Sequence, residues 1–487
     1  MFVLGVDFGG GASKATLLDE SGRVLATATA EYPTFYGEGG KAEQDPADWY
    51  KAACGNIRAI LQKGYDPKEI ACVCFDAATH TAVLMDEEFS PLCPAVYWTD
   101  TRSVGEKRYL AEQFGEEIFS KCKHEVDTIW TLPEILYVKN SFPDLYAKVR
   151  RVCFAKDYVR HLFTGDFVTD RIEAEGSMLF DFDRRVWDEH LLSLVGLTAE
   201  NMPAVVEPLT RVGEVLPAAA EDSGLSVGTP VICGATDTVM EVFAAGGIHA
   251  GDMTLKLATA GRICIVSDRY CADRNIINYS HLENGLYYPG SATKSCAASL
   301  RWFRDTFDGD YAEFDRMAEE IPAGCEGLTF HPYLMGELTP YANPALRGSF
   351  IGISARHTKA HFVRAVMEGV AMSLRDCFTY LREKGISLGD AAFAIGGGAK
   401  SALWRQIVAD ALGITLITTE NNDSSFGSAM CAGIAAGFFA DFADALAHCR
   451  HETGRTEPNP ANRAAYDALF ARYKKISAFL TELSHEG

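Results

Sequence analysis

One pattern of strands and small residues occurs twice in this chain, and it restricts the possible folds more than any other feature. Near the start, the apolar segment 2–8 runs into three glycines, and Lys14 opens a second strand. Near residue 250, the segment Asp252–Ala258 ends in a turn of small residues at 259–261, and Arg262 leads into another apolar strand. The pattern predicts either an internal duplication, with two phosphate-cradling hairpins facing each other around a cleft, or a chance likeness of two hairpins.

The rest of the chain alternates strands with helices, which is typical of an α/β fold. Its 487 residues exceed one ordinary core and fit two domains of about 200–250 residues each. We expect these domains at 1–246 and 247–487. The main helices are expected at 46–62, 297–306, 358–381 and 462–483, with a turn at 422–427 before a small-residue helix at 428–438.

The net charge of −21 argues against nucleic acid and anionic membranes as partners. It does not exclude ATP, because backbone N–H groups, a helix N-terminus or a cation can bind phosphate locally. The 14 cysteines follow no disulfide or metal spacing, which favours a reducing compartment. The sequence shows no signal peptide or transmembrane segment, so we expect a cytoplasmic protein.

The first candidate site is the loop Asp7–Lys14. An acid at a strand end, followed by glycines, lets backbone N–H groups approach phosphate while the acid holds Mg²⁺. A plain glycine hairpin has the same appearance. The triplet Asp7-Phe8-Gly9 is also a protein-kinase motif, but no His-Arg-Asp loop precedes it, and the chain has no Walker A sequence.

The second candidate is Asp237, which follows the apolar segment 231–233. Ligands of α/β proteins bind at the carboxyl ends of strands. Phosphoryl transfer to an alcohol needs a carboxylate that accepts the hydroxyl proton, and Asp237 could serve as this base. The alternative is that Asp237 caps a helix that begins at Thr238.

Two further segments carry weaker signals. Three glycines precede Ala399 in the segment Gly396–Ser401, where a flat adenosine could lie against backbone, although a tight strand–helix turn also uses glycine. Thr79 and His80, and the segment Trp98–Arg102, offer hydrogen-bonding groups and a stacking face for a polyhydroxylated ligand. A single histidine after a strand is more often structural.

Together, and in this order, these segments resemble the FGGY family of carbohydrate kinases, which belongs to the actin-like ATPase superfamily. The resemblance extends over nearly the whole chain. Its most specific parts are the Asp237 segment with its lead-in at 224–231, and the segment 396–401 with Trp404, Gln406, Ala409 and Asp410. Further stretches that resemble the family lie at 130–181, 331–337 and 364–369.

The resemblance implies two ribonuclease-H-like domains with an interdomain cleft, with the sugar mainly on the first domain and ATP mainly on the second. ATP and Mg²⁺ are the cofactors that the resemblance implies. A homodimer is compatible with the resemblance. The positions that match ATP- or phosphate-binding residues are Asp7, Gly10, Ser13, Lys14, Thr259, Gly261, Ala297, Arg301, Gly397, Gly398 and Ser401, with Asp7 also holding the metal. The positions implied in binding the sugar are Thr79, His80, Trp98, Asp100, Arg102 and Asp237, with Asp237 as the catalytic base.

Several positions depart from the family pattern. The family usually has Thr or Ser at the position of Gly10, whose hydroxyl touches phosphate, and Ser13 is a candidate replacement. Leu338 and Glu134 stand where the family carries basic residues. Thr79 and His80 match sugar-binding positions of xylulokinases, so a pentulose such as xylulose is the first expectation for the substrate, while other ketoses, polyols and sugar acids stay open.

Two other functions remain open at this point. One is an actin-like ATPase that phosphorylates no sugar, for which the segment around His80 would be unnecessary. The other is a sugar-binding pseudokinase, which the missing hydroxyl at Gly10 would suggest.

Overall fold

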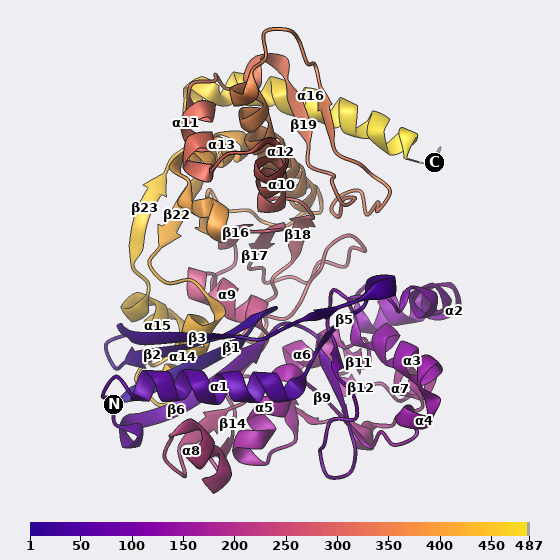
Figure 1. Cartoon of the computed structure of the whole chain (residues 1–487), viewed down its shortest axis with the longest axis vertical. Coiled ribbons are helices and arrows are strands. Elements are labelled where there is room, and N and C mark those ends of the chain that lie inside the picture. Colours follow the sequence, from indigo (N-terminus) through magenta and orange to yellow (C-terminus); the bar gives the residue numbers. More distant parts are fainter. Residues whose placement is uncertain (485–487) are drawn as a thin grey trace. The chain divides into compact units, whose positions relative to one another are not determined.

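The first large sheet grows from a hairpin at the N-terminus (Figure 1). The computed structural model describes residues 1–484. Strand β1 (Phe2–Phe8) pairs antiparallel with β2 (Ala12–Asp19) and parallel with β6 (Ile70–Ala77). The order of the six strands is β14-β15-β6-β1-β2-β3, where the others are β3 (Val24–Glu31), β14 (Arg211–Glu214) and β15 (Pro230–Ile232).

The second large sheet repeats this arrangement. Strand β16 (Met253–Leu257) pairs antiparallel with β17 (Gly261–Ile265) and parallel with β21 (Ala391–Ile395). Its order is β18-β17-β16-β21-β22-β23, completed by β18 (Gly290–Thr293), β22 (Thr415–Thr419) and β23 (Glu452–Thr456). Because the two sheets share their strand order and directions, the predicted repeat extends over both sheets and is more than a chance likeness of two hairpins. The binding of phosphate by the two hairpins stays a prediction.

Helices cover both faces of the first sheet. Successive side chains of a strand point to opposite faces, and Leu4 and Val6 lie in one core with Trp49 of α1 (Pro46–Leu61). Gly5 faces α14 (Ser424–Ala435), where a Cβ atom would lie 2.0 Å from the Ser425 carbonyl oxygen. The helix can therefore approach β1 only because residue 5 is glycine.

The chain divides into two compact units that are not contiguous in sequence. The first unit comprises Met1–Ala244, Tyr279–Gly285 and Asn421–Arg450, and the second comprises Ala245–Asn278, Leu286–Glu420 and His451–Gly487. These units differ from the expected domains 1–246 and 247–487 because two later segments pack with the first unit.

Helix α14 begins four residues before its predicted start at residue 428, and the predicted turn at 422–427 is wrong. The Asp423 side chain accepts a hydrogen bond from the Phe426 N–H group, so it caps the helix and fixes its start. The other main helices lie within two residues of their predicted ends: α1, α10 (Ala297–Phe307), α12 (Lys359–Glu383) and α16 (Arg463–Leu483).

The remaining elements complete each unit. The first unit also contains α2 (Val104–Cys122), α3 (Thr131–Ser141), α4 (Pro143–Tyr146), α5 (Ala155–Thr164), α6 (Arg171–Gly176), α7 (Glu189–Val195), α8 (Pro217–Ser223), α15 (Phe442–Cys449) and the short strands β4 (Phe35–Tyr36), β5 (Ala42–Gln44), β7 (Ala82–Met85), β8 (Ala95–Val96), β9 (Arg151–Phe154), β10 (Val168–Asp170), β11 (Phe180–Asp181), β12 (Val186–Trp187) and β13 (Ala204–Val206). The second contains α11 (Tyr311–Glu319), α13 (Ala402–Leu412), β19 (Thr329–His331) and β20 (Ser349–Ile351), and α12 packs on β17, β18 and α13. Helix α9 (Asp237–Ala245) crosses the boundary of the two units. Within residues 1–484, no helix combines the length and apolar character that a membrane crossing requires.

Candidate active site

Carboxylates gather at one edge of the first sheet. Strands β1, β6 and β15 run parallel, so their carboxyl ends meet at the same edge. Asp7 lies opposite Asp76 in the β1–β6 register. A short connection after β15 leads to Asp237, which is the first residue of α9. Asp423, the cap of α14, completes the group, which we call the acidic cluster (Asp7, Asp76, Asp237 and Asp423).

Burial dominates the electrostatics of the acidic cluster. It raises the pKa of Asp7 to about 7; a hydrogen bond from Asp76 opposes this rise, and the charges of Asp237 and Asp423 add to it. Burial and the neighbouring Asp7 raise the pKa of Asp76 well above its usual range. Asp76 is therefore the protonated partner that donates to Asp7, and the Ser428 hydroxyl donates to Asp76.

The acidic cluster fits a magnesium ion of the kind that kinases bind. Within residues 1–484, no group of three or more His, Cys, Asp or Glu side chains is arranged to enclose a metal. Mg²⁺ is commonly held by one or two carboxylates together with waters and phosphate oxygens. The Asp7 Oδ1 atom is buried and has no hydrogen-bond partner among the described residues, so Asp7 suits that role.

In the first glycine loop, the structure brings Lys14 to the acidic cluster but buries the Ser13 hydroxyl. The Lys14 Nζ atom lies 2.7 Å from an Asp423 carboxylate oxygen, which places this cation at the acidic cluster. The side chain of Ser13 is fully buried, whereas a phosphate contact requires an accessible hydroxyl. The structure therefore gives no support to Ser13 as the replacement for a hydroxyl at Gly10.

His80 lies in a second group, the aromatic cluster (His80, His124, Trp130 and Tyr279). The His80 Nδ1 atom is 2.9 Å from a Glu173 carboxyl oxygen, and its Nε2 atom is 3.0 Å from the Tyr279 hydroxyl. Burial lowers the pKa of His80 to about 3, and the charge of Asp237 partly opposes this. The imidazole is therefore neutral, with both nitrogen atoms held in place.

Tyr279 reaches His80 because its segment is bound to α6. The Arg171 guanidinium donates to the His281 carbonyl at 2.5 Å. The Ser280 hydroxyl and N–H group donate to the Glu175 carboxylate at 2.7 and 3.0 Å. Segment Tyr279–Gly285 is thus a fixed part of the first unit, although the sequence places it beyond the predicted boundary.

Gly176, at the end of α6, makes room for the His80 ring. A Cβ atom at this position would lie 1.8 Å from both Cε1 and Nε2 of His80. No side chain fits there while His80 keeps its position. The glycine is therefore part of the local construction of the aromatic cluster.

The charge of Lys156 contributes to lowering the pKa of His80. Its Nζ atom lies 2.5 Å from Asp157 and 2.8 Å from Asp170, and all three side chains are buried. Because its charge is matched by two carboxylates, Lys156 is committed to the interior of the protein.

Polar side chains of the segment Trp98–Arg102 form hydrogen bonds that hold the segment against β5. Asp100 accepts hydrogen bonds from the Ala42 N–H group at 2.8 Å and from Arg102, which also binds Glu43 at 2.6 Å. These groups tie the loop to β5. Trp98 is exposed and Thr79 is half-buried, and for all four residues the sugar contact stays a prediction.

The expected ATP-binding segments of the second unit lie together. The turn after β16 accepts hydrogen bonds from the start of α10: Ala297 N–H donates to Ala258 and Cys296 N–H donates to Thr259. Arg301 donates to the Thr259 hydroxyl at 3.0 Å. Glycines 396 and 398 also contact this turn, because a Cβ atom at either would lie within about 3 Å of Leu257.

Helix capping and close packing explain the residue types at two of the expected ATP-binding positions. Ser401 caps α13 by accepting from the Trp404 N–H group at 3.0 Å, and it donates to Asp315 at 2.9 Å. A Cβ atom at Gly261 would lie 2.8 Å from Thr293, so close packing requires glycine there. At Gly397 nothing lies within 4 Å of a Cβ atom, which leaves open space beside the backbone.

The sequence did not predict the cluster residues Asp76, Asp423, His124 and Tyr279, nor Glu173, the hydrogen-bond partner of His80. Asp76 carried a usable signal, because it ends an apolar strand as Asp7 does. Asp423 follows the cap pattern of α14. Glu173 and Tyr279 carried none, since each lies far from His80 in sequence.

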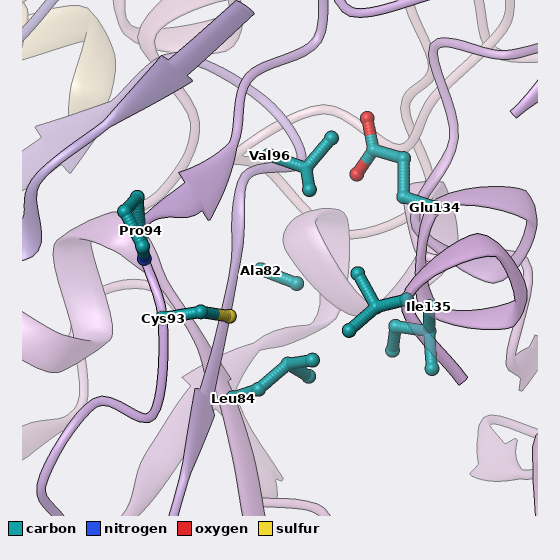
Figure 2. A pocket seen from close by; sticks show the side chains of 8 residues that line it. Ala82, Leu84, Cys93, Pro94, Val96, Glu134 and Ile135 are labelled. Atoms are coloured by element: carbon teal, nitrogen blue, oxygen red, sulfur yellow. The ribbon is translucent and has the colours of Figure 1, made fainter. Parts of the chain in front are cut away.

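A small, mainly apolar cavity lies beside α3 in the first unit (Figure 2). It is lined by Ala82, Leu84, Cys93, Pro94, Val96, Glu134, Ile135 and Val138. Both carboxyl oxygens of Glu134 are buried and have no partner among the described residues. Burial, followed by the charge of Asp100, raises the pKa of Glu134 well above its usual range, so this carboxyl group is neutral.

Comparison with known proteins decides the family. The model of the N-terminal domain of the FGGY family of carbohydrate kinases matches residues 2–244, and that of the C-terminal domain matches residues 274–436. This chain belongs to the FGGY family of carbohydrate kinases. The predicted family and fold, two ribonuclease-H-like domains of the actin-like ATPase type, are confirmed, and the protein is a carbohydrate kinase.

Relatives of this FGGY kinase extend over almost its whole length. It is 31% identical to a xylulose kinase of Bacillus subtilis, covering 99% of this chain and 98% of the relative. It is 28% identical to a gluconokinase of Bacillus subtilis, covering 98% and 96%. The crystal structure of a xylulose kinase from Rhodospirillum rubrum matches with a TM-score of 0.93, 28% identity and full coverage of both chains.

Proposed function

We propose that this carbohydrate kinase transfers the γ-phosphoryl group of ATP to a hydroxyl group of a pentulose such as xylulose, with Asp237 as the base. The observation that carries this proposal is the position of Asp237. Its charge acts on Asp7 and Asp76 in the acidic cluster and also on His80 in the aromatic cluster. One carboxylate therefore lies close to both a phosphate-type site and a sugar-type site.

In the proposed reaction, the Asp237 carboxylate accepts the proton of the sugar hydroxyl as the new O–P bond forms and ADP leaves. Asp7 and Lys14 hold the phosphate side. When bound, Mg²⁺ supplies positive charge to the phosphate oxygens. In the second unit, the turn at Thr259 and the open backbone at Gly397 together suit a nucleotide.

The aromatic cluster favours a neutral sugar over a sugar acid. A carboxylate substrate such as gluconate needs a cation, but the His80 ring is neutral and Lys156 is matched by Asp157 and Asp170. A polyhydroxylated ketose can instead use the hydrogen-bonding edge and faces of these rings. The similarity to xylulose kinases at 31% identity supports the same choice.

The test is ADP release in the presence of xylulose, other pentuloses and hexuloses, gluconate and glycerol. We expect the largest kcat/KM for a pentulose. Asp237→Asn should lower turnover by about 10²–10⁴-fold while nucleotide binding by calorimetry stays unchanged. Asp144→Asn, an exposed change in α4, is the matched control.

Three outcomes would count against the proposal. Unchanged turnover in Asp237→Asn would remove this residue as the base. ATP turnover that no sugar stimulates would favour an actin-like ATPase. Failure to bind ATP with Mg²⁺ would favour a sugar-binding pseudokinase. The cytoplasmic location and the homodimer stay predictions.

A further inference from the structure

The place that a side chain at Gly10 would take is already occupied. An ideal Cβ atom at Gly10 lies 2.6 Å from the hydroxyl oxygen of Tyr97, whereas the ring atoms Cζ and Cε1 of Tyr97 are 3.5 and 3.8 Å away. Only the hydroxyl conflicts with a side chain, since the ring atoms are at ordinary contact distance. A phenol hydroxyl from residue 97 thus stands in the glycine loop, which has no hydroxyl of its own at residue 10.

Both partners of this contact are held firmly. The Gly10 carbonyl oxygen accepts hydrogen bonds from Thr34 at 2.7 Å and from Gln44 at 3.0 Å. On the other side, the Tyr97 N–H group donates to the Ala42 carbonyl at 3.0 Å, and only 5% of Tyr97 is exposed. The position of the hydroxyl relative to the loop is therefore built into the fold.

The Tyr97 hydroxyl has a proton to give. Its oxygen accepts a hydrogen bond from the Trp98 side chain, which leaves the phenol's own O–H available as a donor. Burial raises the pKa of Tyr97, and the charges of Asp237 and Asp7 raise it further, so the phenol stays protonated. These same charges show that the hydroxyl lies near both carboxylates of the proposed reaction.

We propose that the Tyr97 hydroxyl donates a hydrogen bond to the phosphoryl group in transit, in the position that a hydroxyl side chain at residue 10 would otherwise serve. The inference rests on the proposed function, because it assigns a new contact within the same reaction. A neutral donor fixed beside developing negative charge stabilises the transition state more than the ground state. Tyr97 would therefore act mainly on kcat.

The test is a double-mutant cycle with Tyr97→Phe, Gly10→Ser and the double variant. Tyr97→Phe should lower kcat by about 10- to 100-fold with little change in the KM for sugar, because one hydrogen bond to a charged group is lost. Gly10→Ser alone should also lower kcat, since its Cβ atom meets the Tyr97 hydroxyl at 2.6 Å. The double variant should recover at least tenfold over either single variant, because removing the phenol oxygen makes room for a serine hydroxyl.

Tyr109→Phe removes an exposed phenol hydroxyl and is the matched control, with wild-type kcat expected. Thermal unfolding and nucleotide calorimetry on every variant separate a folding defect from a lost contact. Wild-type kcat in Tyr97→Phe, or losses that simply add in the double variant, would overturn the inference while leaving the kinase intact. A wild-type protein that phosphorylates no sugar would instead overturn the proposed function.

Discussion

Replacing Glu134 with glutamine should stabilise the protein, and the gain should increase with pH. In the fold, the Glu134 carboxyl group is buried without a partner and its pKa is raised well above 4.5. In the unfolded chain the same group ionises near 4.5. Folding must therefore take up a proton at neutral pH, and glutamine, which is of similar shape, removes that requirement.

Linkage sets the size of the effect. Below pH 4.5 the Glu134 carboxyl is neutral in both states, so it does not disfavour folding. As the pH rises from 4.5 toward the raised pKa of the folded state, the unfolded chain ionises and the protein loses stability. Between those two pKa values, each pH unit costs the wild type about 1.4 kcal/mol. The difference in unfolding free energy between Glu134→Gln and wild type should grow by about that amount per unit.

Urea unfolding of both proteins at pH 5.5, 6.5 and 7.5 measures this difference, and the subtraction cancels all other titrating groups. Glu112→Gln, an exposed change in α2, should show a difference that does not depend on pH. A pH-independent difference for Glu134→Gln would refute the reasoning, because it would mean that Glu134 is ionised in the fold.

Three further changes test the packing described above. Gly176→Ala should lower kcat/KM by about 100-fold, since a Cβ atom 1.8 Å from the His80 ring must displace it; a wild-type sugar kinetic profile would contradict this. Gly5→Ala should cost about 1–3 kcal/mol or more in urea unfolding, because it pushes α14 off the sheet. Gly55→Ala, whose Cβ atom meets nothing within 4 Å, is the control for both and should not destabilise. Ser401→Ala should cost about 1 kcal/mol through the lost cap of α13, and Ser401→Thr should keep most of that stability.

Local patterns predicted the elements, and the repeated hairpin predicted the duplicated sheet. Apolar periodicity and glycine placement act over a few residues, so they can be read directly from the sequence. The start of α14 was missed because the small residues after Asp423 resemble a turn, although the aspartate is a helix cap. The family resemblance, not the local patterns, is what favoured a catalytic role for Asp237 over a helix cap, and that role stays a prediction.

The partners of the site residues could not be predicted in the same way. Glu173 and Tyr279 lie 93 and 199 positions from His80, and only the path of the chain brings them to it. Asp100 and Arg102 were predicted as sugar ligands, and the structure adds hydrogen bonds between both and β5 that the sequence did not indicate, while their sugar contact stays a prediction. Residue type alone does not reveal whether a polar group is already paired.

The division of the first unit into three chain segments affects how the protein is made. A nascent chain that has reached Ala244 lacks α14, so the Gly5 face of its sheet has no helix to cover it, and it also lacks Tyr279 beside His80. The first unit can be completed only after Arg450 has left the ribosome. We therefore expect the first unit to complete its folding after residues 245–278 and 286–420 of the second unit have been synthesised, and not before them as in ordinary domain-by-domain folding.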